Sequence, residues 1–389
     1  MNLKYWLLAA TLIIFQSSAY AVAKAKQVKC DDGMSLAHAV RTARAGTTLY
    51  VSGTCHEQVT IKRDRIRLIG KNGASIDGAQ LDPAQFEFNP LVRIVDAVGV
   101  VIKDLAIING PAEGIIVEGK ANVTLNNLNV SHNSNVGVLV DHARVVVNGG
   151  SYESNQGGID VVSTGAALLQ GAISLQHNII FGIAASNGAS LEVRGASLNA
   201  SNNQLAGVLL EGGNMAIFNF GVSVGSQILA DQNGLCGLVL VGGGFLDVVA
   251  PPPFYFSGVH QINTSNNTVC GILMATGSKL ESPFGAATFT VAGNGAGMTV
   301  SGNSDVSING GLNIINNLGP GLIADGAGVL TLAPLDPSPP PALPTEISGN
   351  AGPDVVLNFG SRATFASNVN VGSIVCDGTA LARGAATCP

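Results

Sequence analysis

One short pattern recurs along most of this 389-residue chain: an Asn, three residues, a Gly, and a triplet whose first and third residues are apolar. The marked positions are Gly114, Gly137, Gly158, Gly182, Gly207, Gly237, Gly271, Gly297 and Gly321, with Asp354 in the equivalent place of a tenth unit. From residue 114 to residue 354 one unit averages about 27 residues, a period typical of solenoids. The repeat constrains the fold strongly, because each unit must stack on its neighbours to bury its apolar face.

The apolar triplets predict one inward-facing strand in every unit. Their first and third residues run from Ile115 and Val117 to Val355 and Leu357, and none is polar. Alternation with a period of two places both on one face of a strand. Further short apolar runs between Gly and Asn turns predict up to three short strands per unit. We therefore expect an all-β solenoid of about ten or more coils, built from parallel strands around a common interior.

The Asn residues of the repeat predict turns and a hydrogen-bonded stack. Asn tolerates the left-handed backbone of a tight turn, and stacked Asn side chains can bond along the axis of a sheet. The Asn lies four residues before the Gly in six units, and Asn350 keeps this distance from Asp354. It is displaced by one residue at Asn109, Asn155 and Asn294.

The first residues are typical of a secretory signal. Lys4 precedes an apolar run, and Ala19-Tyr20-Ala21 predicts cleavage after Ala21. The alternative is a membrane anchor, but the run is short for a span of about 20 residues. We expect a secreted, periplasmic or cell-surface protein with no membrane span in the mature chain. The predicted parts are the signal peptide 1–21, an N-terminal cap with first coils 22–108, the repeats 109–375 and a disulfide-closed tail 376–389.

A short helix is predicted ahead of the repeats. Residues 35–45 combine a Ser cap, an amphipathic pattern and a stop at Gly46. A helix over the first coil would cover the open end of a solenoid. Strands are expected after it at 47–51, 59–61, 66–69 and 75–77.

The six Cys residues predict disulfides, because an exported chain with an even count usually pairs them. Cys236 and Cys270 each precede a marked Gly, so they take the same position in consecutive coils. Coils about 4.8 Å apart place their Cα atoms within disulfide range. Pairing Cys30 with Cys55 and Cys376 with Cys388 would then close the two ends, although six cysteines permit 15 connectivities.

The segment Gly53-Thr-Cys-His-Glu57, Leu68-Ile-Gly70 and the units that follow resemble right-handed parallel β-helix proteins of the pectin-lyase-like superfamily. The resemblance covers roughly residues 28–389 and implies a right-handed parallel β-helix with a short N-terminal capping helix. That superfamily includes pectate lyases, polygalacturonases, alginate-modifying enzymes and adhesins, so the resemblance implies no single activity. The polygalacturonase-like motif set Asn-Thr-Asp, Asp-Asp, Gly-His-Gly and Arg-Ile-Lys is missing from the coils of this chain, as is the lyase-like Arg-x-Pro-x-x-Arg.

A group of ionisable residues is the best candidate for catalysis. Glu118 and Asp141 take the same outward position in neighbouring coils, His142 follows, and Asp160 lies on the next coil. Stacked carboxylates with a His could act as acid and base on a sugar or hold Ca²⁺. The alternative is an ordinary solvated face. No other cofactor is expected.

The charge pattern excludes one class of partner and indicates another. Charged residues make up 11% of the chain and the net charge is −6, which excludes a polybasic nucleic-acid binder. The cluster Lys62-Arg63-Asp64-Arg65, with Arg67 and Lys71, could meet an acidic glycan or a lipopolysaccharide surface, or be a solvated edge. Three long units carry apolar, Pro-rich insertions at 218–220, 249–256 and 332–344, which could be flaps.

The middle residue of each triplet predicts a partner surface. These outward positions are Ile116, Leu139, Asp160, Ala184, Leu209, Val239, Leu273, Thr299, Ile323 and Val356. A contiguous apolar stripe needs a covering, and a side-by-side homotrimer or a contact with an envelope protein would supply one. We expect a secreted or envelope-associated protein that acts by surface binding or assembly, with a polysaccharide as a candidate ligand. The alternative is a carbohydrate-active enzyme of lyase or epimerase type.

Overall fold

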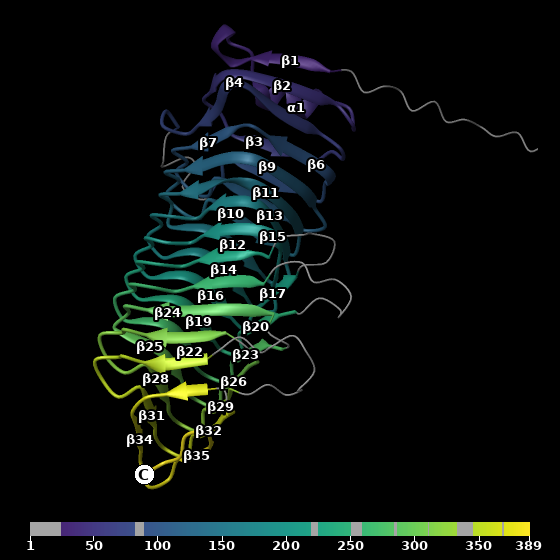
Figure 1. Cartoon of the computed structure of the whole chain (residues 1–389). Helices are drawn as coiled ribbons and strands as arrows, with labels where there is room; N and C mark the ends of the chain where they lie inside the picture. The colour runs from purple at the N-terminus through teal and green to yellow at the C-terminus, as the bar shows by residue number, and fades with distance from the viewer. Residues whose placement is uncertain are drawn as a thin grey trace, which may run out of the picture.

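The structure, a computed structural model, describes residues 25–81, 89–218, 225–249, 259–283, 286–309, 311–332, 345–367 and 369–389. The coils stack along one long axis, with the N-terminal elements at one end and the C-terminus at the other (Figure 1). Two long sheets run the length of this stack, and every pairing between their strands is parallel. The fold is a right-handed parallel β-helix, as predicted.

The thirteen-stranded sheet, here called sheet B, contains the first strand of each coil. Its strands are β3 (Val59–Ile61), β5 (Val92–Val95), β8 (Ile115–Glu118), β10 (Val138–Asp141), β12 (Gly157–Val162), β14 (Phe181–Ser186), β16 (Ala206–Glu211), β19 (Cys236–Val241), β22 (Cys270–Met274), β25 (Ala296–Val300), β28 (Leu322–Ala324), β31 (Val355–Leu357) and β34 (Ile374–Cys376).

The twenty-two-stranded sheet, here called sheet A, contains the second and third strands. Up to the eighth coil they are β1 (Lys26–Lys29), β2 (Thr48–Cys55), β4 (Arg67–Asp77), β6 (Val98–Lys103), β7 (Ala106–Ile108), β9 (Asn122–Ser131), β11 (Arg144–Glu153), β13 (Ala166–Ser174), β15 (Ser190–Asn199), β17 (Asn214–Phe218) and β18 (Gln227–Leu229). They continue as β20 (Phe245–Val248), β21 (His260–Asn263), β23 (Lys279–Ser282), β24 (Ala287–Ala292), β26 (Asp305–Ile308), β27 (Leu312–Ile315), β29 (Val329–Leu332), β30 (Thr345–Ser348), β32 (Arg362–Phe365), β33 (Val369–Val371) and β35 (Leu381–Gly384).

The register predicted from the marked glycines is confirmed. Val138 lies opposite Ile115 on one side and opposite Ile159 on the other, and the later coils continue this pairing to Val355. The first and third residues of the triplets point inward and are buried. They form part of one apolar core that runs through the stack.

The second and third strands are more continuous than the sequence predicts. In β9, β11, β13 and β15 they form single strands that turn a corner, and the register shifts at this corner between β11 and β13 and between β13 and β15. Residues with positive φ bend the chain inside these strands, among them Asn127, Gly150 and Gly171. Such residues adopt a left-handed backbone at little cost, so the corner needs no separate loop.

A ladder of buried asparagines holds the coils together at the corner before sheet B. The side-chain oxygen of each Asn accepts the backbone N–H of the Asn one coil earlier, as in Asn133 to Asn155 at 2.9 Å. The ladder consists of Asn133, Asn155, Asn178, Asn203, Asn233, Asn267, Asn294, Asn317 and Asn350. Asp354 ends it by accepting both the backbone and the side-chain N–H groups of Asn350.

The ladder explains why a glycine marks each unit. A Cβ atom at Gly114 would lie 2.8 Å from the Asn133 amide nitrogen and 2.7 Å from a Val130 methyl carbon. Asn109, which the repeat placed in this series, is outside the ladder: its φ is +58° and its amide donates to Asp77. The N–H of Gly110 takes the corresponding place by donating to the Asn133 oxygen.

Helix α1 (Leu36–Thr42) covers the N-terminal end, and it is shorter than predicted. Ser35 caps it, as expected, by accepting the N–H of His38. The helix stops at Thr42 because Ala43 is extended and buried, and the Thr42 hydroxyl bonds the carbonyl of His38. Among the described residues, no helix has the length and apolar character needed to cross a membrane.

The three predicted disulfides are present: Cys30–Cys55, Cys236–Cys270 and Cys376–Cys388. The Cα atoms of Cys236 and Cys270 are 4.6 Å apart, as their equivalent positions in adjacent coils require. The C-terminal tail is more than a loop, because β35 pairs with β32 and continues sheet A. The predicted signal peptide and most of the three insertions lie outside the described residues.

Candidate functional site

The outer face of the third strands carries a polar row along the molecule. Each of its members is paired with the next across sheet A, and none is buried. The polar row consists of Asn129, Ser151, Ser174, Asn199, Leu229, Asn263, Thr290, Asn313, Glu346 and Asn370. All but Leu229 offer an amide, hydroxyl or carboxylate group to a ligand. Consecutive members lie about 4.8 Å apart, which is the spacing of parallel strands.

A polar hollow lies where the polar row begins. Its volume is about 700 Å³, and Asn129 and Ser151 of the polar row form part of its lining. His132, Glu153 and Ser154 also line it. Ser131 and Glu153 are paired across β9 and β11, and the N–H of His132 donates to the Ser154 carbonyl at 3.1 Å. The hollow therefore offers hydroxyl, amide, imidazole and carboxylate groups on two adjacent coils.

The predicted catalytic residues lie together on the outer face of sheet B, but most have partners. Glu118 and Asp141 are paired across β8 and β10, as the repeat requires. Glu118 forms an ion pair with Arg93 at 2.8 Å, and Asp141 bonds the His142 ring at 2.7 Å. This arrangement gives each carboxylate its own positively charged or hydrogen-bonding neighbour.

Asp160 stands apart from the other three residues. It is paired with Leu139 and Ala184, so its neighbours in the sheet are apolar. Burial raises the pKa of Asp160 to about 6, and the negative charge of Glu211 adds to the rise. A carboxyl group in this condition exchanges a proton near neutral pH, which is the property of a general acid or base.

The apolar stripe on sheet B is partly covered by its own neighbours. Ala184 is buried in a small cluster with Val136 and Phe181. Val239 is buried beside the Cys236–Cys270 disulfide. The remaining members of the stripe are half-buried.

Apolar side chains at the corner before sheet B extend the stripe. Ile179, Leu205, Val269 and Leu318 are exposed, and Leu318 keeps 76% of its surface accessible. Each lies between a ladder Asn and the following marked Gly. The middle of the outer face of sheet B and this corner are therefore rich in apolar side chains, whereas the polar row on sheet A is hydrophilic.

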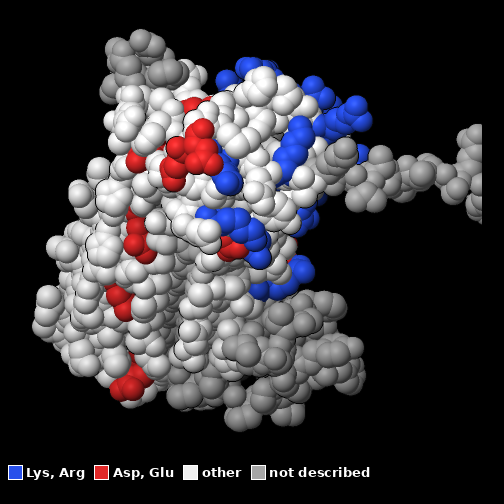
Figure 2. All heavy atoms as spheres, turned by 90° about the horizontal axis from the view of Figure 1, so that it is seen from above, with Lys and Arg blue, Asp and Glu red and all other residues white. Residues whose placement is uncertain are grey.

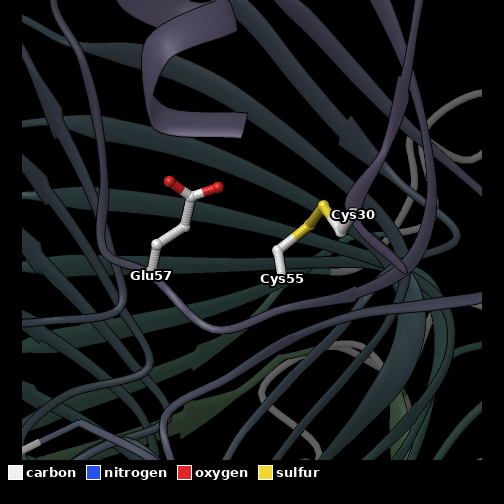
Figure 3. Close-up of side chains that lie close together, drawn as sticks. All are labelled: Cys30, Cys55 and Glu57. Atoms are coloured by element: carbon white, nitrogen blue, oxygen red, sulfur yellow. A yellow bond between two sulfur atoms is a disulfide. The ribbon is translucent and has the colours of Figure 1, made fainter. Parts of the chain in front are cut away.

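One group of metal-type ligands occurs in the part of the chain that the structure describes, and it has a structural role. The group consists of Cys30, Cys55 and Glu57. The two sulfurs are joined in a disulfide, so neither is a thiolate. The Glu57 carboxylate lies beneath the helix beside this disulfide (Figure 3), where it accepts the Ser35 hydroxyl at 2.7 Å and the N–H of Leu36. Glu57 thus helps to cap α1.

Sequence reasoning missed Arg93 and the polar row. Arg93 lies in a coil that lacks the Asn–Gly mark, and only the alternation of Val92-Arg93-Ile94 indicates its strand. The polar row carries a readable signal, because polar residues alternate with apolar ones in each third strand, as in Gln261-Ile262-Asn263. To align the third strands of successive coils, their register has to be known, and the triplets give a register only for sheet B.

Comparison with known proteins finds only distant structural matches. No family model matches the chain, and no curated protein matches it. An alginate lyase from Paenibacillus sp. is 12% identical with a TM-score of 0.41, covering 90% of this chain and 98% of the lyase. Pectate lyase Pel9A is 14% identical with a TM-score of 0.36, covering 93% of this chain and 80% of that one. PfbA, a surface adhesin of Streptococcus pneumoniae, is 9% identical with a TM-score of 0.37, covering 90% of this chain and 92% of the adhesin.

The names of these solved structures describe two lyases and a surface adhesin, so their roles differ from one another. Identities of 9% to 14% carry no residue of their sites onto this sequence. Its ligand has to be argued from its own surface. The chain is a right-handed parallel β-helix.

Proposed function

We propose that this protein is exported and binds a polysaccharide along the polar row of sheet A. The observation that supports the proposal is the row itself, in which nine of ten stacked outward positions carry an amide, a hydroxyl or a carboxylate. Sugar hydroxyls are both donors and acceptors, and Asn, Ser and Thr side chains complement both functions. Three disulfides fit an oxidising compartment outside the cytosol.

The geometry favours a long ligand over a small one. From Asn129 to Asn370, with a gap at Leu229, the polar groups repeat at about 4.8 Å, a spacing similar to the length of one sugar in an extended chain. The hollow at Asn129 and Ser151 adds a deeper position at one end of the row. Glu346 is the one charged member of the row, so the ligand at this face is a neutral or weakly charged glycan.

A matched pair of double variants tests the proposal. Thr290→Val with Asn313→Ala removes two neighbouring polar groups of the row. Thr299→Val in β25 of sheet B, with Asn358→Ala just after β31, makes the same substitutions at positions that are also half-buried. A glycan array of the mature chain first identifies a ligand, and titration calorimetry then compares the variants.

The expected result is a loss of affinity confined to the polar row. Two lost hydrogen bonds weaken binding roughly 5- to 100-fold, and the sheet B variant stays within about twofold of the parent. Equal losses in both variants, or the absence of any bound glycan on the array, would reject the polar row as the binding face.

Binding is favoured over catalysis at the patch on sheet B. Glu118 is ion-paired with Arg93 and Asp141 is bonded to His142, whereas Asp160 lies beside Leu139 and Ala184 and burial raises its pKa to about 6. A lyase, epimerase or hydrolase needs at least a second group placed to exchange a proton with the same sugar. Release of unsaturated product or reducing ends from a polysaccharide, abolished by Asp160→Asn in a folded protein, would overturn this preference.

We also propose that the apolar side of sheet B mediates assembly. Exposed Ile179, Leu205, Val269 and Leu318 flank the half-buried stripe, so the surface is richer in apolar groups than a solvated strand face. A side-by-side homotrimer would bury this surface in each copy without forming filaments. Analytical ultracentrifugation tests the idea: the parent chain should sediment as an oligomer, and Leu205→Glu with Val269→Glu should sediment as a monomer. A monomeric parent at high concentration would reject it.

A further inference from the structure

Positive charge is concentrated at the N-terminal end of the molecule. Fourteen of the 19 Lys and Arg residues lie within the first 120 residues, whereas 14 of the 25 Asp and Glu residues lie after them. Figure 2, a view from above in which the N-terminal end faces the reader, shows the Lys and Arg side chains gathered toward one side of the molecule. The remainder of the helix is net acidic.

The centre of this charge is the turn between β3 and β4. Lys62, Arg63 and Arg65 lie in the turn, and Arg67 begins β4. All four side chains are exposed, and no ion pair joins any of them to another described residue. The buried Ile66 anchors the turn in the core, so the turn holds its cations at the surface.

Neighbouring layers extend the patch along the stack. The N–H of Gly46 donates to the Asp64 carbonyl at 3.0 Å, which places the turn containing Arg44 directly against this one. On the other side, the N–H of Arg65 donates to the Val98 carbonyl at 2.9 Å. Exposed Arg44 and Lys120 therefore belong to the same edge of the helix as the central turn.

Two Asp residues at this edge accept hydrogen bonds from the backbone of neighbouring turns. Asp64 accepts the N–H of Val98 at 2.9 Å, and Asp96 accepts the N–H of Lys120 at 3.0 Å. Each carboxylate is thereby held against the backbone of the next coil. Both carboxylates stay exposed, but the basic side chains outnumber them at this edge.

We propose that this edge, here called the basic edge and defined by Arg44, Lys62, Arg63, Arg65 and Arg67, binds an acidic polysaccharide. Unpaired exposed cations attract anions at long range, and guanidinium groups pair with carboxylate, sulfate or phosphate oxygens. Four of these cations lie in or directly after one turn and Arg44 lies against it in the adjacent layer, so the edge presents a dense group of charges to a polyanion. This site is independent of the neutral polar row on sheet A, and it would hold the protein on an acidic matrix.

The experiment uses two double variants that remove the same charges. Arg63→Gln with Arg67→Gln weakens the basic edge and leaves the left-handed backbone of Arg65 unchanged. Arg362→Gln with Arg383→Gln is the control, since both residues are exposed on sheet A at the C-terminal end. The probes are immobilised dextran sulfate and soluble polygalacturonate at about 0.1 M salt, with circular dichroism melts to show that all proteins fold.

The parent chain should bind both probes and be released by added NaCl, because exposed ion pairs are screened by salt. The Arg63→Gln, Arg67→Gln variant should bind roughly 3- to 25-fold more weakly, and the control within about twofold of the parent. Binding of the neutral glycan along the polar row should be the same in all three proteins, so the two proposals fail separately.

Three outcomes would overturn the inference: no binding of either probe by the parent, equal weakening in the two variants, or binding that 1 M NaCl leaves intact. Binding confined to phosphatidylglycerol vesicles, with neither polysaccharide retained, would assign the edge to a membrane surface and also reject the proposal.

Discussion

Removing one side chain from the middle of the asparagine ladder should destabilise the whole helix. Asn233 is fully buried, and its side-chain oxygen accepts two hydrogen bonds from Asn203, at 2.9 Å from the backbone and 3.2 Å from the amide. Asn233→Ala leaves both donors buried without an acceptor. A stranded buried donor costs about 1–3 kcal/mol, so the free energy of unfolding should fall by about 2–6 kcal/mol. Asn267 loses less, because its oxygen keeps the backbone N–H of Asn233 at 2.8 Å.

Replacement by aspartate separates the two functions of the ladder amide. Asn233→Asp keeps an acceptor for Asn203 but loses the N–H that donates to the Asn267 oxygen at 3.0 Å. It also buries a negative charge, so the variant should be at least as unstable as Asn233→Ala at neutral pH. The protein itself uses a carboxylate in this series only at Asp354, where the series ends and the N–H and hydroxyl of Ser373 donate to it.

The assay is urea unfolding followed by far-ultraviolet circular dichroism at 25 °C and pH 7, with an outward Asn as the matched control. Asn313→Ala removes the same amide from the surface, where the described residues give its side chain no hydrogen bond, and should change the free energy of unfolding by less than about 0.5 kcal/mol. A loss below about 1 kcal/mol for Asn233→Ala would show that the ladder contributes little and that the argument from stranded donors is wrong.

Further predictions concern pH, sulfur and the end of the ladder. Burial lowers the pKa of His260 from 6.5 to about 4, so protonation favours the unfolded chain. The free energy of unfolding should be highest above pH 6.5 and should fall by up to about 3 kcal/mol on acidification to pH 4. Urea titrations across this range should show that His260→Gln removes the slope. Cys236→Ser with Cys270→Ser should lower the free energy of unfolding by about 2–4 kcal/mol, and dithiothreitol should then affect the variant less than the parent. For Asp354, burial raises the pKa, but hydrogen bonds from Ser373 and Asn350 outweigh it and lower the pKa overall, so its carboxylate stabilises the fold above pH 3.8 and less as pH falls. Asp354→Asn should therefore destabilise at pH 7 by about 1–2 kcal/mol, and a difference that persists unchanged at pH 2 would contradict this reasoning.

The sequence alone determined the architecture of sheet B, because parallel stacking repeats one local pattern at a constant rise. Once Gly114 and Gly137 are taken as equivalent, the pairing of Ile115 with Val138 follows without any long-range information. The same equivalence led to the Cys236–Cys270 disulfide, and the Asn of each unit led to the ladder.

Only the tertiary structure decided which surface groups have partners. Arg93 reaches Glu118 from a coil without the repeat mark, and Glu57 folds back to the start of α1, so neither contact has a periodic signal in the sequence. Phe181 packs with Ala184 and Val136 in a small cluster outside the main core, although an alternation of two would place residues 181 and 184 on opposite faces of β14. Local periodicity specifies where a backbone strand lies, whereas the contacts of an outward side chain depend on which residues the stack happens to bring beside it.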